Sequence, residues 1–221
     1  MARSEAGMMK TVLAYGDSMT WGSDAETGGR HGFDDLWPNV LQAGLSGKAR
    51  VHADGLRGRT TAYDEHLADC DRNGARTLPT SLYMHAPLDL VIIMLGANDM
   101  KPHIAGTAIA AMQGMRRLIS IVKNHNPGMG DESRPDLLIV APPPLCETAD
   151  PEYAGMFAGG IKQSQMLSSL YADLADEQGV GFFDASSVAE ASPVDGVHLD
   201  AANTRAIGKA LVPVTTVMLG L

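Results

Sequence analysis

The sequence predicts an α/β fold with three layers, in which helices cover both faces of a five-stranded parallel sheet in the flavodoxin-like, doubly wound manner. Apolar runs of strand length alternate with longer stretches of helical periodicity, a pattern typical of such sheets. The run at residues 88–95 is apolar almost throughout, as expected of a central strand buried on both faces. The 221 residues contain no visible repeat or linker, so we expect a single domain spanning residues 1–221.

Five apolar runs have the length and composition of strands. They are rich in Val, Leu, Ile or Phe and are separated by stretches with turn residues or helical spacing. The strands are predicted at residues 10–15, 49–53, 88–95, 136–141 and 180–184.

Helices are predicted between the strands and after the last one, at residues 33–45, 60–69, 104–124, 160–178 and 200–217. Either Asp34 or Asp35 is expected to cap the first helix, and Gly179 is expected to end the fourth. One apolar stripe on the longest helix is predicted to belong to the core. It consists of Ile104, Ala108, Ala111, Met115, Leu118, Ile119 and Val122.

Two segments, residues 71–87 and 142–159, have no predicted secondary structure. The first contains Gly74 and Pro79, and the second contains three consecutive prolines. Loops this long within a compact domain are usually functional or buried against a partner. Pocket walls and subunit contacts are both open interpretations of these segments.

The overall charge argues against nucleic acid and anionic membranes as partners. The chain has 26 acidic and 17 basic residues, a formal charge of -9, and no run rich in Lys or Arg. The apolar stretch at residues 11–15 is too short for a signal peptide or a membrane span. We therefore expect a soluble, cytoplasmic protein.

The cysteines and most of the histidines do not form a recognisable metal site. Cys70 and Cys146 lie far apart and outside any CxxC spacing, so we predict two buried or half-buried free thiols. Six of the seven histidines have no metal-ligand spacing and are predicted to be structural or exposed. They are His31, His52, His66, His85, His103 and His125. We expect neither a metal nor a cofactor.

The two ends of the chain carry residue types that together can activate a serine. Ser18 follows the first predicted strand, and Asp195 precedes His198 by three positions just before the last helix. A serine becomes a nucleophile when a histidine takes its proton, and a carboxylate on Nδ1 holds that histidine in the required tautomer. Each motif alone is weak evidence, since Asp17 or Ser18 as a helix cap is an equally good interpretation of the first.

Two further motifs follow the second and third predicted strands. Residues 53–60 contain glycines, which let a backbone N–H approach a bound group closely, and Asn98 supplies a side-chain amide. Both are suited to stabilising an oxyanion, although a plain turn and an Asx turn remain alternatives. Arg57 and Arg59 are expected on the surface or in salt bridges.

At these residues the chain resembles the SGNH (GDSL-type) hydrolase family. GDSMTWG, GLRGRTT and GAND are most similar to the branch of small bacterial arylesterases, acyltransferases and acetylesterases. The resemblance implies that Ser18 is the nucleophile, with His198 as base and Asp195 as the acid that orients it. It also implies that the N–H groups of Ser18 and Gly58 and the side chain of Asn98 bind the oxyanion.

The chain departs from the family pattern at two places. Met19 stands where leucine is usual, an apolar change that should preserve packing. Ala53 stands where many members have asparagine, and either Gly55 or Gly58 could be the second donor. We choose Gly58 because it precedes Arg59 and Thr60.

The resemblance implies a serine esterase that acts on short-chain, acetyl-type esters, including aryl esters and acetylated carbohydrates, and that forms a homo-oligomer. Acyl transfer or perhydrolysis through the same acyl-enzyme is one alternative, and a non-catalytic module that binds a small ligand is another. Candidate pocket walls are Trp21, Tyr153, Met156 and Phe157, for which core or subunit contacts are an equal alternative.

Overall fold

The predicted fold class is confirmed. The computed structural model describes residues 9–126, 128 and 134–221. Five strands form one all-parallel sheet in the order β2-β1-β3-β4-β5. The strands are β1 (Lys10–Gly16), β2 (Ala49–Gly55), β3 (Leu90–Met94), β4 (Asp136–Ala141) and β5 (Gly181–Asp184).

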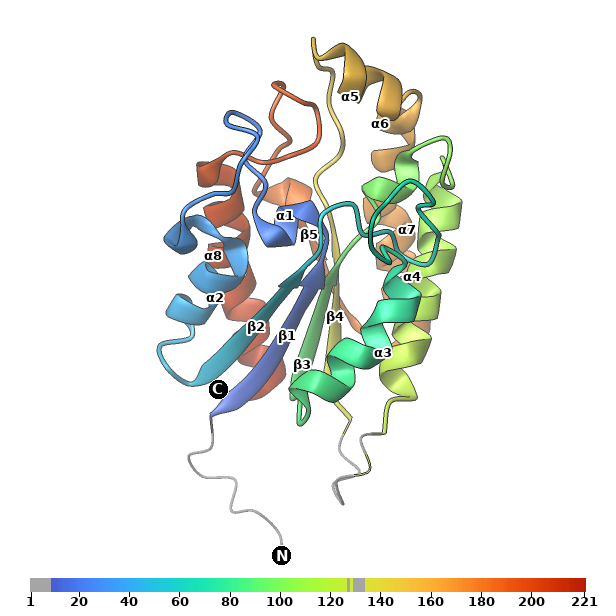
Figure 1. Cartoon of the computed structure of the whole chain (residues 1–221). Coiled ribbons are helices and arrows are strands. Elements are labelled where there is room, and N and C mark those ends of the chain that lie inside the picture. The colour runs from blue at the N-terminus through green and yellow to red at the C-terminus, as the bar shows by residue number, and fades with distance from the viewer. Residues whose placement is uncertain (1–8, 127, 129–133) are drawn as a thin grey trace, which may run out of the picture.

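Helices cover both faces of this sheet (Figure 1). On one face lie α2 (Trp37–Gly44) and α8 (Ala201–Leu219), and on the other lie α3 (Gly74–His85), α4 (Ala108–Lys123) and α7 (Leu167–Gln178). Side chains of β3 alternate between the two core clusters: Ile92 packs with Trp37 of α2, whereas Ile93 packs with Leu118 of α4. All five residues of β3 are buried, which confirms it as the central strand.

Short helices join the main elements. They are α1 (Ser18–Trp21), α5 (Pro151–Met156) and α6 (Gly160–Ser164), together with the 3-10 turns η1 (Phe33–Asp35), η2 (Asn98–Met100) and η3 (Ala185–Ser187). In Figure 1, α1 and α5 lie toward the end of the sheet at which the strands finish.

The prediction of a helix at residues 60–69 is wrong. That stretch is irregular, and the helix of this connection is α3, in the segment for which we predicted no secondary structure. Asn73 caps α3 by accepting a hydrogen bond from the N–H of Ala75 at 3.1 Å. Gly74 permits close packing, since a Cβ there would lie 2.5 Å from the Thr60 carbonyl oxygen. Gly74 and Pro79 suggested a loop, but glycine opens this helix and proline is accommodated within it.

Three other helices differ from prediction at their ends. The helix expected from residue 33 begins at Trp37, and neither Asp34 nor Asp35 caps it. The helix expected at residues 104–124 begins after Thr107, whose side chain caps it. The helix expected at residues 160–178 is divided into α6 and α7, although Gly179 ends it in the left-handed conformation, as predicted.

The expectation of two buried or half-buried thiols is correct for only one of the cysteines. Both cysteines are free, but Cys70 is exposed and only Cys146 is partly buried.

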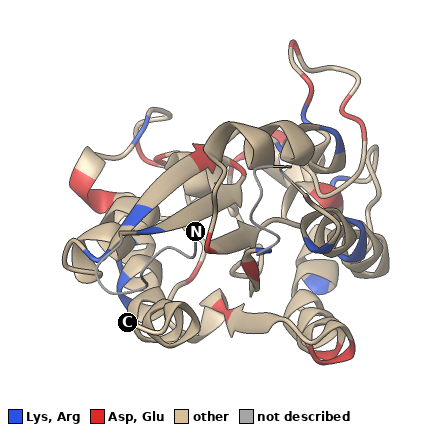
Figure 2. Cartoon of the chain, turned by 90° about the horizontal axis from the view of Figure 1, so that it is seen from below, with Lys and Arg blue, Asp and Glu red and all other residues tan. Residues whose placement is uncertain are grey.

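Among the described residues no helix is both long and apolar enough to cross a membrane. Figure 2 shows basic and acidic residues distributed over several elements.

The strand order determines where a ligand can bind. The chain reverses direction across the sheet between β1 and β3, which are neighbours at its centre. In open α/β sheets ligands bind beyond the carboxyl ends of the strands at such a switch point. The segments that follow β1 and β3 carry Ser18 and Asn98.

Candidate active site

Ser18 is positioned by a tight turn between β1 and α1. Asp17 caps α1, because its Oδ1 accepts the N–H of Met19 at 2.9 Å. Gly16 leaves no room for a side chain, since a Cβ there would lie 2.1 Å from Thr20 Oγ1. The capping interpretation of the motif is therefore correct for Asp17, and this same cap places Ser18 at the carboxyl end of the strand.

A second tight turn brings Asp195 and His198 to Ser18. Asp195 Oδ1 accepts the N–H groups of Val197 and His198 at 2.9 and 2.8 Å. Its Oδ2 lies 2.6 Å from His198 Nδ1, and His198 Nε2 lies 2.9 Å from Ser18 Oγ. Gly196 has φ +77° and approaches the Cys146 carbonyl too closely for a Cβ. Three residues from opposite ends of the chain thus form one continuous series of hydrogen bonds.

The environment of Asp195 favours its ionised form. Burial acts to raise the pKa of this carboxyl, but hydrogen bonds from the His198 ring and from the N–H groups of Val197 and His198 outweigh burial and lower it. An ionised carboxylate can only accept hydrogen bonds. It therefore requires the proton on Nδ1, which leaves Nε2 free to accept a proton from Ser18.

Asn98 and Gly58 lie on the segments that follow β3 and β2. Asn98 is buried, and its Nδ2 donates to the Arg59 carbonyl oxygen at 3.2 Å and to Asp17 Oδ2 at 3.3 Å. Gly58 occupies a turn with φ +79°. Gly55 has a different constraint, because a Cβ there would lie 2.2 Å from the Trp21 nitrogen, and this reflects close packing of β2 against α1.

Arg59 is a structural part of the site that sequence reasoning only partly anticipated. We expected Arg59 either on the surface or in a salt bridge. It forms a salt bridge, and it is only 4% exposed. Its Nη1 donates to the carbonyl oxygens of Gly16 and Asp54, and its Nη2 pairs with the Asp54 carboxylate at 2.9 Å. The guanidinium therefore joins the ends of β1 and β2.

Two buried carboxyl groups were not identified as functional from the sequence. Burial raises the pKa of Asp17 to about 6 and that of Asp99 to about 7. Asp99 accepts the N–H and hydroxyl of Thr61, which links the end of β3 to the segment after β2. Both acids directly precede or follow a motif residue, and that adjacency was the only sequence signal for them.

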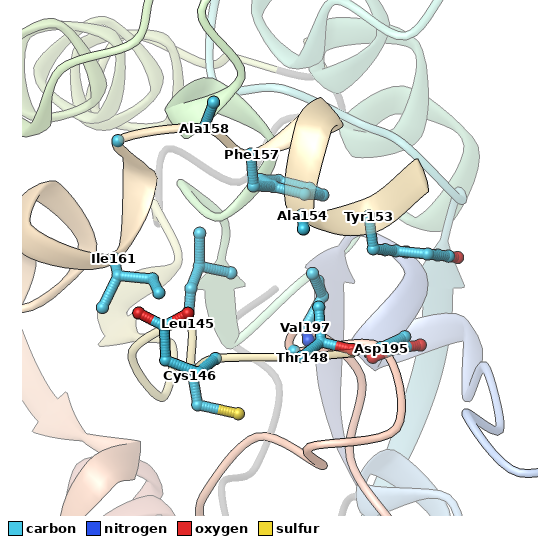
Figure 3. Close-up of a pocket in the computed structure, with 13 residues that line it drawn as sticks. Leu145, Cys146, Thr148, Tyr153, Ala154, Phe157, Ala158, Ile161, Asp195 and Val197 are labelled. Atoms are coloured by element: carbon cyan, nitrogen blue, oxygen red, sulfur yellow. Dashed lines mark hydrogen bonds between the residues drawn. The ribbon is translucent and has the colours of Figure 1, made fainter. Parts of the chain in front are cut away.

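A cavity of about 170 Å³ lies beside this centre (Figure 3). Tyr153 and Phe157 line it from α5 and the residue after α5, and Asp195 lines the facing side. The Tyr153 ring also meets the His198 ring edge-on, with 6.0 Å between centroids. Ser18 and His198 do not line the cavity, so it adjoins the centre rather than containing it.

The other two candidate pocket residues lie elsewhere. Met156 packs against the larger core cluster, and Trp21 is flanked by the guanidinium groups of Arg30 and Arg57, at 4.9 and 4.8 Å from its ring. Neither lines the cavity of Figure 3.

Comparisons with known proteins agree with the fold and the motifs. Residues 14–206 match the model of the GDSL-like Lipase/Acylhydrolase family. The comparison with curated proteins found no match.

Several solved structures are similar over nearly the whole chain. A carbohydrate acetylesterase family member from Sinorhizobium meliloti is 62% identical, with a TM-score of 0.95, over 96% of this chain and 100% of that one. A second carbohydrate acetylesterase from Sinorhizobium meliloti is 37% identical, with a TM-score of 0.89, over 95% and 99% of the two chains. The aryl esterase of M. smegmatis is 38% identical, with a TM-score of 0.88, over the same shares.

The family model covers most of the chain, and the structural relatives agree with it in fold and in overall sequence. The protein belongs to the GDSL-like lipase/acylhydrolase family and is a carboxylic ester hydrolase.

Proposed function

We propose that the protein hydrolyses short-chain acyl esters through an acyl-enzyme on Ser18. The observation that carries the proposal is the series of hydrogen bonds from Asp195 through His198 to Ser18, at 2.6 and 2.9 Å. In the first step His198 Nε2 takes the hydroxyl proton while Ser18 Oγ attacks the ester carbonyl. The tetrahedral intermediate then expels the alcohol, which receives the proton from His198.

The second half of the cycle uses the same groups in reverse. His198 removes a proton from water, and the resulting hydroxide attacks the acyl-enzyme carbonyl. The intermediate expels Ser18 Oγ, which regains its proton from His198, and the carboxylic acid leaves. No group beyond the ester, water and these side chains is needed for this balance.

Three donors are proposed to bind the oxyanion: the N–H groups of Ser18 and Gly58 and the Nδ2 group of Asn98. Among the described residues neither N–H donates a hydrogen bond, so both are available to a ligand. The two N–H groups of Asn98 Nδ2 donate to Asp17 Oδ2 at 3.3 Å and to the Arg59 carbonyl oxygen at 3.2 Å, and these bonds hold the side chain in place. To bind the oxyanion, Asn98 exchanges one of these two hydrogen bonds for the substrate oxygen. The two backbone N–H groups are fixed before the reaction, and such donors stabilise charge that develops in the transition state without having to reorganise.

Replacing Asn98 with alanine is expected to lower kcat by about 10²- to 10³-fold, since this is the usual effect of removing one oxyanion donor. The rate of p-nitrophenyl acetate hydrolysis measures it. Asn124→Ala, at the exposed end of α4, is the matched control and should retain full activity. Full activity in Asn98→Ala would contradict the oxyanion assignment.

The proposed substrates are acetyl-type esters of phenols and of carbohydrates. Support comes from the relatives named as carbohydrate acetylesterases and as an aryl esterase. A panel of p-nitrophenyl esters from acetyl to octanoyl, with acetylated sugars at equal concentration, tests this. We expect kcat/KM to be highest for acetyl and at least about tenfold lower for octanoyl, since each methylene that does not fit costs roughly 1 kcal/mol or more. A maximum at octanoyl would contradict the proposal.

We also infer that the protein is a homo-oligomer in the cytoplasm. Support for an oligomer comes from the resemblance to a branch whose members associate, and from large apolar side chains that are largely exposed, Phe33, Leu67 and Val217. Support for the cytoplasm comes from the exposed free thiol of Cys70, which suits a reducing compartment. Light scattering on the purified protein tests the first inference, and a monomeric mass would contradict it.

A further inference from the structure

Two arginines adjoin the candidate oxyanion donor Gly58. A Cβ added to Gly58 would lie 2.8 Å from Arg72 Nη1 and 2.9 Å from its Cζ, so the Arg72 side chain packs directly against this turn. Arg72 makes no side-chain hydrogen bond or ion pair with the part of the chain that the structure describes. Its Nε is buried without any partner.

Arg57 precedes Gly58 in the chain and is exposed. Its guanidinium lies 4.8 Å from the ring of Trp21, three residues beyond Ser18. It is also close enough to lower the pKa of Tyr153, although burial dominates and raises that pKa. Tyr153 in turn meets His198 edge-on. Among the described residues no carboxylate forms an ion pair with Arg57.

A third cation lies nearby. Lys101 is 6% exposed, and its Nζ lies 5.5 Å from the ring of Phe157, which lines the cavity beside the site. Burial lowers the pKa of Lys101, Glu65 opposes this effect, and Arg72 adds to it. Arg72 and Lys101 are thus close enough to repel each other.

The nearby acids do not neutralise the two arginines. Asp54 is paired with Arg59, and Asp195 is held by His198. Glu65 contacts Lys101 and His103. Asp17 and Asp99 are fully buried, and burial raises both of their pKa values. Glu147 lines the cavity, and Asp150 and Glu152 lie close enough to Tyr153 to raise its pKa. None of the described acids forms an ion pair with Arg57 or Arg72, so these two guanidinium groups are available to attract an anion.

We propose that the preferred substrates are acetyl-type esters whose alcohol part carries a carboxylate, which Arg57 and Arg72 bind. This inference rests on the proposed function. An acetyl group has no room for a charge, so the anion must belong to the alcohol. Acetylated acidic sugars and acetylated hydroxybenzoic acids are the chemical classes that fit, and guanidinium groups are suited to carboxylates because they donate paired hydrogen bonds.

The test compares 4-acetoxybenzoate with its uncharged methyl ester. The quantity measured is the ratio of kcat/KM for the anionic ester to that for the neutral one, and each value is divided by the rate constant for hydrolysis by hydroxide. We expect this ratio to exceed one in the wild type and to fall roughly threefold to tenfold in Arg57→Gln and in Arg72→Gln. It should also fall as salt is added, because salt screens charges at a surface.

Charge-preserving and remote variants complete the experiment. Arg57→Lys and Arg72→Lys should retain most of the preference, and Arg117→Gln, an exposed arginine of α4, should leave the ratio unchanged. A wild-type ratio of one or less, or an equal ratio in the wild type and both glutamine variants, would overturn the inference. Hydrolysis of the neutral ester that depends on Ser18 would then still support the proposed function, whereas absence of any hydrolysis would refute both.

Discussion

Replacing Ser18 with alanine is expected to reduce kcat for p-nitrophenyl acetate by about 10⁶-fold, since losing the nucleophile of a triad removes the acyl-enzyme route. The structure gives no other hydroxyl within hydrogen-bond distance of His198 Nε2, among the residues it describes, that could take over. Stability should change little, because Ser18 Oγ makes one side-chain hydrogen bond, which contributes roughly 1 kcal/mol. Turnover measured beside thermal unfolding separates the two effects.

The control for this variant is Ser169→Ala on the exposed side of α7, which should keep full activity. A serine-directed phosphonate adds a second measurement: intact wild type should gain one adduct located at Ser18, and Ser18→Ala should gain none. An unmodified wild-type protein with no esterase activity would favour the non-catalytic binding module. A loss of less than about tenfold relative to the wild type in Ser18→Ala would contradict the role of Ser18.

The sheet was predictable because its signal is local. A parallel strand buried on both faces must be apolar at nearly every position, and β3 shows this directly. The helix α3 was not predictable in the same way. Gly74 is required by contact with the carbonyl oxygens of Thr60 and Thr61, and no local pattern distinguishes a glycine needed for packing from one that makes a turn.

In the candidate site, too, residues with a local sequence signal were predictable, and residues that depend on contacts across the fold were not. Ser18, Asn98, Asp195 and His198 stand in short motifs, so the sequence was enough to propose them as site residues. Arg59 and Asp99 each have a partner that only the fold brings close: the Gly16 carbonyl oxygen for Arg59 and Thr61 for Asp99. The pocket residues were harder still, because whether an aromatic side chain lines a cavity depends on packing around it. Tyr153 and Phe157 line the cavity, whereas Met156 packs into the core.

The Asp195→Asn variant is expected to lower kcat by about 10⁴-fold while the fold is kept. The asparagine carbonyl can still accept the N–H groups of Val197 and His198, which now bind Oδ1. Its NH₂ group then faces His198 Nδ1 and cannot accept a proton from it. Nδ1 must become the acceptor, so the proton moves to Nε2, and His198 can no longer take the proton of Ser18. The loss arises from the wrong tautomer rather than from a displaced loop.

Two measurements distinguish the tautomer explanation from simple unfolding. The first is the thermal unfolding of Asp195→Asn, which should remain a cooperative transition at room temperature and above if the fold is kept, and the second is a proton resonance. A short hydrogen bond between Nδ1–H and a carboxylate, 2.6 Å in this structure, should give a proton resonance far downfield in the wild type, and this resonance should be absent in Asp195→Asn. Asp173→Asn, at an exposed aspartate of α7, makes the same chemical change away from the site and should retain both the resonance and the activity.

The pKa of Asp195 is lower in the folded protein than in the unfolded chain. Its carboxylate therefore stabilises the fold above the unfolded pKa, and this contribution is lost only as the pH falls through the pKa of the folded state. At neutral pH the wild type therefore holds a charged Asp195, and a variant that retained full activity there would show that His198 does not depend on it.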